Sequence, residues 1–244
     1  MKLKFIHKQK IANDSWDLAF EKPEGFAYEP GQYLEINLDH PNPDDRGTTR
    51  WFTMSSSPTE GDLMLTTRLV ERHSSFKQAL FGLKAGDSVE VKGPMGKFLL
   101  PQDSSVPLVW IAGGIGITPF RSQLKFIIDN EESRDITLIY SNRTKGDICF
   151  DELWQQASEK LAKFKLISTL VDEIPQGWHG ETGMVDEAMI KKAVGQLGGK
   201  QYFISGPEPM VEAFKPKLVA MGIADTAIHQ DWFPNYTEEF FKVN

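Results

Sequence analysis

The segment from Val109 to Phe120, with the sequence VWIAGGIGITPF, constrains the fold more than any other part of the chain. Its apolar run ends in three closely spaced glycines, after which apolar residues recur with helical spacing at positions 120, 124, 127 and 128. The pattern predicts a buried strand, a tight turn and a helix, with Thr118 as the N-cap and Pro119 in the first helical position. The glycines of the turn are Gly113, Gly114 and Gly116.

Glycines at these positions let a ligand approach the free amides and the positive dipole at the helix start, where a phosphate binds well. The turn departs from two common phosphate-binding fingerprints. Pro119 stands at the third glycine of G-x-G-x-x-G, and no Gly-Lys-Ser/Thr follows. Taken alone, the segment also fits a glycine-rich connection that binds nothing.

The 244 residues show two different sequence patterns, one after the other. Up to about residue 101, short alternating strands are separated by Pro, Gly and Asp clusters, and one short helix over 75–81 can be capped by Ser74 or Ser75. After the polar, proline-flanked stretch 101–107, strands alternate with helices. We therefore expect a six-stranded antiparallel β-barrel at 1–101 and a doubly wound parallel-sheet α/β domain at 106–244.

The expected elements follow from this periodicity. In the first domain, strands are expected over 3–7, 16–20, 33–38, 51–54, 63–69 and 88–91. In the second, strands are expected over 108–112, 136–140, 164–170 and 201–205, and helices over 119–129, 150–161, 186–194 and 209–221.

Composition excludes several classes of protein. A net charge of −7 without a basic stripe argues against a nucleic-acid partner. The single cysteine, Cys149, excludes an intramolecular disulfide framework and an iron–sulfur cluster held by four cysteines of this chain, and the five scattered histidines predict no metal site. Neither a signal peptide nor a membrane-length apolar run is evident, so we expect a cytoplasmic protein.

A heptad in the first domain, RWFTMSS from Arg50 to Ser56, places an arginine, aromatic rings and hydroxyl groups on one strand. Such groups can pair with a phosphate, stack on a planar ring and hydrogen-bond its edge. An ordinary half-buried strand with one surface arginine fits the heptad about equally well.

The heptad does not stand alone. It is followed by GPMGKF at 93–98, GGIGITP at 113–119 and SGPEPM at 205–210. With these four motifs in this order, essentially the whole chain resembles the ferredoxin–NADP reductase superfamily, in its stand-alone form without an iron–sulfur domain. The resemblance implies a flavin-dependent oxidoreductase that passes a hydride from NAD(P)H to FAD and then electrons to a separate acceptor, of the ferredoxin or flavodoxin type or another redox partner.

In the barrel, the resemblance implies that Arg50 pairs with the flavin phosphate, that Phe52 lies against the isoalloxazine or ribityl, and that Thr53 hydrogen-bonds near flavin N5. A helix start at 74–77 would hold the pyrophosphate, which favours FAD over FMN. Ser55 or Ser56 would complete the phosphate contacts. The expected flavin-contacting residues are Arg50, Trp51, Phe52, Thr53, Ser55, Ser56, Thr67, Arg68, Ser74, Ser75, Phe76 and Lys77.

In the second domain, the resemblance implies that 113–119 cradle the dinucleotide and that 205–210 place the nicotinamide against the flavin. Thr53 and Ser205 are the expected catalytic residues. Because the family commonly has cysteine where this chain has Ser205, we expect a change in rate rather than in chemistry. The expected dinucleotide-binding residues are Gly113, Gly114, Gly116, Ile117, Thr118, Pro119, Ser141, Asn142, Arg143, Ser205, Gly206, Pro207 and Met210. Trp232 and Phe233 are further expected cofactor contacts.

The nucleotide preference depends on charges that follow two predicted strands. Arg143 and Lys145 would neutralise the 2′-phosphate of NADPH, whereas Asp172 and Glu173 would repel it. Solvated loop charges are an equal alternative. Between NADH and NADPH we favour NADH.

The C-terminal segment is rich in aromatic residues. In relatives, an aromatic residue near the end shields the flavin face that the nicotinamide enters, and Trp232, Phe233 or Tyr236 can do so here, with Asp231 orienting the arrangement. The same rings can equally anchor the tail or form a dimer contact. Two other functions stay open: a flavin-binding electron-transfer subunit active only within a multi-component assembly, and a nucleotide-binding regulator without flavin.

Overall fold

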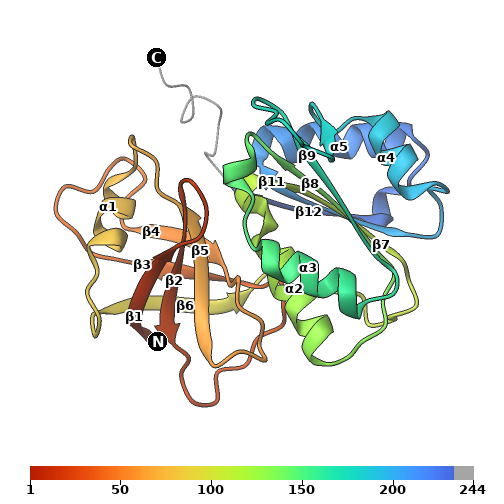
Figure 1. Ribbon diagram of the computed structural model, residues 1–244. Coiled ribbons are helices and arrows are strands. Elements are labelled where there is room, and N and C mark those ends of the chain that lie inside the picture. The colour runs from red at the N-terminus through yellow and green to blue at the C-terminus, as the bar shows by residue number, and fades with distance from the viewer. Residues whose placement is uncertain (234–244) are drawn as a thin grey trace. The chain divides into compact units, whose positions relative to one another are not determined.

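The structure is a computed structural model that describes residues 1–233 of the chain, shown in Figure 1. It divides into two compact units. The first consists of Met1–Leu100 together with Thr118–Phe126, and the second begins with Pro101–Ile117 and resumes at Ile127. Each unit holds one six-stranded sheet. No helix among residues 1–233 is both long enough and apolar enough to cross a membrane.

The sheet of the first unit is antiparallel, with the strand order β4-β3-β6-β1-β2-β5. A bridge between Met54 and Leu65 joins the two ends of this order, so the sheet closes on itself. The predicted six-stranded antiparallel barrel is therefore confirmed. Its strands are β1 (Lys2–Lys10), β2 (Ser15–Glu21), β3 (Tyr33–Asn37), β4 (Thr49–Thr53), β5 (Asp62–Arg68) and β6 (Ser88–Met95).

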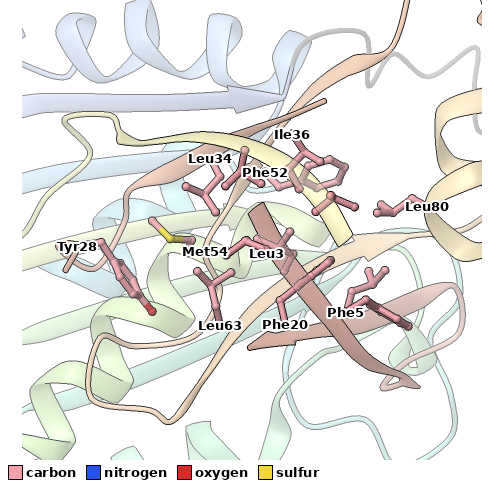
Figure 2. Packing of buried hydrophobic residues seen from close by; sticks show 14 of the residues in the cluster. Leu3, Phe5, Phe20, Tyr28, Leu34, Ile36, Phe52, Met54, Leu63 and Leu80 are labelled. Atoms are coloured by element: carbon pink, nitrogen blue, oxygen red, sulfur yellow. The ribbon is translucent and has the colours of Figure 1, made fainter. Parts of the chain in front are cut away.

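Alternation along the strands builds the core of the barrel. Every second side chain of a strand faces inward, so Leu3 and Phe5 of β1 meet Leu63 and Leu65 of β5 in one apolar cluster. Figure 2 shows this packing, with Met54 between the strands. The helix α1 (Ser75–Gly82) adds Phe76 and Leu80 to the same cluster. Its N-cap is Ser74, whose Oγ accepts a hydrogen bond from the Lys77 amide at 3.2 Å.

The sheet of the second unit is parallel throughout, with the strand order β10-β9-β8-β7-β11-β12. Its strands are β7 (Leu108–Gly113), β8 (Ile136–Asn142), β9 (Phe164–Leu170), β10 (Glu181–Thr182), β11 (Gln201–Pro207) and β12 (Ile228–Phe233). The periodicity located the four inner strands but missed the two at the edges. β10 has only two residues, and β12 pairs on one side only and contains polar residues that hide its alternation.

Helices cover both faces of the parallel sheet. The helix α3 (Asp151–Lys160) places Trp154 against Tyr140 of β8, with ring centroids 6.2 Å apart. The helices α4 (Glu187–Val194) and α5 (Glu208–Ala220) share an apolar cluster with Ile111 and Ile204 of the opposite face. Figure 1 shows α4 and α5 on one side of the sheet and α3 on the other. The predicted doubly wound architecture is confirmed.

The turn after β7 differs in detail from the prediction. The 3₁₀ helix η1 (Gly114–Ile117) runs directly into α2 (Thr118–Asp129). Thr118 is thus the first residue of α2 and not a flanking N-cap, because the chain is already coiled before it, and Pro119 is the second residue.

Three consecutive polar residues of α2 bind the barrel within the first unit. Arg121 donates to the Ser55 carbonyl at 3.1 Å and forms an ion pair with Glu60. Ser122 Oγ donates to the Ser56 carbonyl at 2.6 Å, and Gln123 Nε2 donates to the Phe98 carbonyl at 2.8 Å. These contacts explain why residues 118–126 group with the barrel.

Gly31 lies against the hydrogen bond between Gln123 and the Phe98 carbonyl. A Cβ at Gly31 would lie 2.1 Å from the Phe98 carbonyl oxygen and 2.8 Å from Gln123 Nε2, and its φ is +102°. Gly25 also has positive φ, but a Cβ there meets nothing within 4 Å. We expect Gly31→Ala to lower the free energy of unfolding by roughly 3 kcal/mol or more, and Gly25→Ala by only about 1 kcal/mol. Denaturant unfolding of both variants checks this, and equal losses would contradict the packing argument.

Candidate functional site

The heptad and the start of α1, which the sequence predicted separately, meet in the first unit. Arg50 and Phe52 alternate with Trp51 along β4, so both face the first turn of α1. The guanidinium carbon of Arg50 lies 5.2 Å from the centroid of the Phe76 ring. Phe52 stacks on the same ring, with centroids 6.0 Å apart. A cation and two aromatic rings are thus gathered at a helix N-terminus.

The Arg50 side chain is only 10% exposed and is held by the loop before β4. Nη1 donates to the carbonyls of Arg46, Gly47 and Thr49 at 2.8, 3.1 and 2.8 Å. Nη2 donates to Asp44 Oδ1 at 2.8 Å. A guanidinium has five N–H donors, so within the described residues 1–233 the N–H of Nε and one N–H of Nη2 are left for a ligand.

Ser75 and His40 complete this cluster. Ser75 Oγ accepts a hydrogen bond from the Asp44 amide at 3.0 Å and lies 3.0 Å from His40 Nε2. Burial opposes ionisation of Asp44, but hydrogen bonds from Arg50 and the Arg46 amide hold the pKa of Asp44 below its ordinary value. His40 and Asp44 were missed by the sequence analysis, because isolated loop residues carry no periodic signal.

Other predicted flavin contacts lie elsewhere in the barrel. Ser55 Oγ accepts from Thr66 Oγ1 at 2.7 Å, and Ser56 Oγ accepts from the Met64 amide at 2.9 Å. Both serines are buried in this internal network and are not brought to Arg50. Thr53 is also buried, at the end of β4.

Trp51 and the predicted flavin contacts on β5, Thr67 and Arg68, have surroundings different from those of Arg50. The Trp51 side chain is exposed, and its Nε1 donates to Glu35 Oε2 at 3.1 Å. Thr67 is buried, whereas Arg68 forms an ion pair with Asp14 at 3.1 Å. Lys77 Nζ donates to the Arg68 carbonyl at 2.5 Å, which ties the start of α1 to the end of β5.

The predicted dinucleotide-binding residues 113–117 and 205–210 come together in the second unit. The strand order reverses between the adjacent strands β7 and β11, so the turns that follow them leave toward opposite sides. In open parallel sheets, ligands bind at such a switch point, beyond the carboxyl ends of the strands. Gly113 is the last residue of β7, and Ser205 lies two residues before the end of β11.

The glycines of the two turns have different roles. A Cβ at Gly113 would lie 2.4 Å from Met210 Sδ, and a Cβ at Gly116 would lie 2.3 Å from the Ser205 carbonyl oxygen. Gly116 is needed for close packing of this turn on β11, because its Cβ would meet main-chain atoms. At Gly113 and Gly206 the nearest atom belongs to the flexible Met210 side chain. Gly114 has a φ of +50° and open space beyond its Cα, so it alone of the three glycines after β7 fits the expected approach of a phosphate. Residues 117–119 are buried, whereas Gly114 is partly exposed.

Ser205 pairs with Asp231 of the neighbouring strand. Ser205 Oγ donates to Asp231 Oδ2 at 3.5 Å, and the two residues are in register across β11 and β12. Burial raises the pKa of Asp231 to about 7, although the Ser205 hydrogen bond opposes the rise. Trp232, the next residue, is half exposed. The side chain of Phe233 and the whole of Tyr236 lie outside the described residues.

Charges at the ends of β8 and β9 are paired. Arg143 Nε donates to Asp172 Oδ2 at 2.5 Å, and the amides of Asp172 and Glu173 donate to the Arg143 carbonyl. Ser141 and the buried Asn142 precede Arg143 on β8. Arg143 and Asp172, which the sequence analysis expected to have opposite effects on a 2′-phosphate, thus form one ion pair. Lys145 lies in the short helix η2 (Lys145–Asp147).

Substitution of the two glycines by alanine separates packing from ligand approach. We expect Gly116→Ala to destabilise the fold by roughly 2–4 kcal/mol, because its Cβ would collide with main-chain atoms of the next strand. Gly114→Ala costs only about 1–2 kcal/mol of backbone strain, but places a methyl group in the open space of the turn. Thermal unfolding and NADH titration check this, and an unimpaired NADH affinity in Gly114→Ala would remove the turn from the binding site.

Asp231 predicts a pH dependence of stability. Its folded pKa of about 7 lies above the ordinary aspartate pKa of 3.8, so between these values the folded chain holds a proton that the unfolded chain releases. The contribution of Asp231 to the free energy of unfolding therefore falls as the pH rises between these two pKa values. Asp231→Asn removes the effect, and we expect the variant to be more stable than the wild type by roughly 2–4 kcal/mol at pH 8 and nearly equal at pH 4. Unfolding across pH checks the difference, and parallel curves would contradict it.

Comparisons with known proteins agree with this geometry. The family model of the oxidoreductase FAD-binding domain matches residues 2–99, and that of the oxidoreductase NAD-binding domain matches residues 110–215. The electron transfer component XylA of the Pseudomonas putida xylene/toluene monooxygenase is 30% identical over 94% of this chain and 65% of its own length. The NADH-cytochrome b5 reductase 2 of Mycosarcoma maydis is 34% identical over 84% of this chain and 61% of its own length.

Solved structures show the same likeness. The Amycolatopsis cytochrome P450 reductase GcoB has a TM-score of 0.83 and 27% identity, over 96% of this chain and 70% of that one. The cytochrome b5 reductase domain of Ulva prolifera nitrate reductase has a TM-score of 0.79 and 26% identity, over 94% and 96%. The chain spans somewhat less than two thirds of the two curated relatives named above. With an FAD-binding and an NAD-binding domain in succession, the chain belongs to the ferredoxin–NADP reductase superfamily, as its four motifs predicted.

Proposed function

We propose that this chain transfers a hydride from NADH to bound FAD and passes the electrons to a separate acceptor. The meeting of Arg50, Phe52 and the first turn of α1 in the FAD-binding unit carries the proposal. When bound, FAD supplies a ring that accepts a hydride from nicotinamide and releases electrons singly or in pairs. The part of the protein is to hold the two cofactors, align their rings and exclude water.

We propose residues 1–101 as the flavin-binding domain. Arg50 offers two unused N–H donors to the flavin diphosphate, next to the first N–H groups of α1, which have no partner inside the helix. The aromatic pair Phe52 and Phe76 forms one wall of the same place. Thr53 follows on the same strand, as the proposed hydrogen-bonding residue near flavin N5.

We propose residues 106–244 as the dinucleotide-binding domain. The open space at Gly114, at the switch point of the sheet, supports a place for the pyrophosphate. Ser205, Gly206 and Pro207 would place the nicotinamide beside it. The Ser205–Asp231 hydrogen bond holds the serine hydroxyl in a fixed orientation, and Asp231 can take up or release a proton near neutral pH.

The ion pair between Arg143 and Asp172 supports NADH over NADPH. The pair leaves Arg143 without an unpaired charge for a 2′-phosphate, and Glu173 adds a negative charge beside it. Relatives named NADH-cytochrome b5 reductase support the same nucleotide.

The acceptor is proposed to be a separate redox partner. The relatives include electron-transfer and reductase components of monooxygenases, so an oxygenase component or a small redox protein of the ferredoxin type is the partner we propose. We also propose a cytoplasmic location, which the single cysteine supports because a protein without disulfides suits a reducing compartment.

Rapid anaerobic mixing of the FAD-loaded full chain with NADH and, separately, with NADPH tests the function. We expect NADH to bleach the flavin faster. Asp172→Asn should free Arg143 for the 2′-phosphate and narrow the ratio of the two rates about tenfold, the effect of roughly 1.4 kcal/mol of charge interaction. Glu173→Gln is the comparison variant, because it removes a neighbouring negative charge but leaves this ion pair in place, and it should narrow the ratio less.

Three outcomes would change the proposal. An unchanged ratio in Asp172→Asn would refute the nucleotide assignment. Flavin that stays bound but is not reduced by either nucleotide would favour the electron-transfer subunit of a larger assembly. A folded chain that holds no FAD in excess cofactor would refute the function.

A further inference from the structure

We propose that Asp44 is a positioning residue, which holds the Arg50 guanidinium in the orientation that receives the flavin diphosphate. The inference rests on the flavin-binding function proposed above and extends it to a loop that the heptad does not include. Asp44 lies between β3 and β4, six residues before Arg50 in the chain. It acts through Arg50 and has no proposed contact with the cofactor.

Hydrogen-bond acceptors from residues 44–49 surround part of the guanidinium. Three main-chain carbonyls, those of Arg46, Gly47 and Thr49, take the donors of Nη1, and Asp44 Oδ1 takes one donor of Nη2 at 2.8 Å. The guanidinium carbon lies 5.2 Å from the centroid of the Phe76 ring. These contacts restrain the orientation of the arginine, and among residues 1–233 they leave the N–H of Nε and one N–H of Nη2 unused.

Asp44 is itself fixed to the helix where the diphosphate is proposed to bind. Its amide donates to Ser75 Oγ at 3.0 Å, and its Oδ1 also accepts from the Arg46 amide at 3.0 Å. Ser75 Oγ lies 3.0 Å from His40 Nε2, and His40 Nδ1 lies 2.8 Å from the Leu38 carbonyl. A continuous series of hydrogen bonds therefore runs from the end of β3, through the first turn of α1, to Arg50.

The charge of Asp44 has two opposite effects on a diphosphate. As an anion near a bound anion it repels the ligand, but this repulsion falls with distance and is screened by salt. As the partner of a largely buried guanidinium, Asp44 offsets the free-energy cost of burying the Arg50 charge. It also fixes the Arg50 side chain before the ligand arrives, so that binding does not have to restrict the arginine rotamers. Because the pair is direct and the arginine is 10% exposed, we expect orientation to outweigh repulsion.

The affinity of the apoprotein for FAD, measured by quenching of flavin fluorescence, tests the proposal. We expect Asp44→Ala to raise the Kd for FAD about tenfold. Asp44→Asn keeps an oxygen acceptor for Nη2 and should lie between the wild type and Asp44→Ala. Asp45→Ala is the matched control: it removes the same charge from the adjacent, exposed position, for which the described structure shows no ion pair, and should leave the Kd within about twofold.

Riboflavin separates positioning from general damage, because it has the flavin ring and no phosphate. We expect Asp44→Ala to leave the riboflavin Kd unchanged. Equal weakening for FAD and riboflavin would mean that the barrel is disturbed, and would overturn the proposal. An FAD affinity of Asp44→Ala equal to or tighter than that of the wild type would overturn it as well.

A double-mutant cycle distinguishes this inference from the function on which it rests. If Asp44 acts through Arg50, then Asp44→Ala has no further effect on the FAD Kd in the Arg50→Ala background. If Arg50→Ala alone leaves the FAD Kd unchanged, the proposed phosphate contact of Arg50 fails. If Arg50→Ala weakens FAD binding and the effect of Asp44→Ala simply adds to it, only the positioning role fails.

Discussion

The close approach of the turn after β7 to the carboxyl end of β11 is the constraint on which the second unit depends. A Cβ at Gly116 would lie within 2.5 Å of main-chain atoms of Ser205 and Gly206 in β11, so only glycine lets the turn pack against this strand. The same packing leaves Gly114 facing open space with a positive φ. The place available to a phosphate is thus a consequence of how the sheet reverses its strand order, and it needs no dedicated side chain.

In the barrel, the comparable constraint is the buried charge of Arg50. Arg50 is nearly enclosed, and a buried guanidinium is stable only when its donors find acceptors. The loop before β4 supplies two carbonyls and Asp44, Thr49 of β4 supplies a third carbonyl, and Ser75 ties the loop to α1. A loop, a strand and a helix are therefore organised around one cation, whose two remaining donors suit an anionic ligand.

Chain order and packing order differ at α2. The residues from Thr118 to Phe126 follow the glycine turn of the second unit, but they pack with the first. Arg121, Ser122 and Gln123 achieve this mainly by binding main-chain carbonyls, which are available at any residue of the barrel. Since such acceptors leave no mark on the sequence, the three polar residues of this amphipathic helix do not reveal in the sequence where they bind.

The sequence by itself determined the two folds, the four inner strands of the parallel sheet and the motifs that place the chain in its family. Alternating and helical burial is visible in residue order, and each motif depends on side-chain chemistry at fixed spacing. Only the tertiary structure decided that Asp44 and His40 belong with Arg50, that Arg143 pairs with Asp172, and that Gly114 alone of the three glycines is open. These facts concern residues from different loops or the space around a backbone, and both are set by how separate elements pack, which residue order does not record.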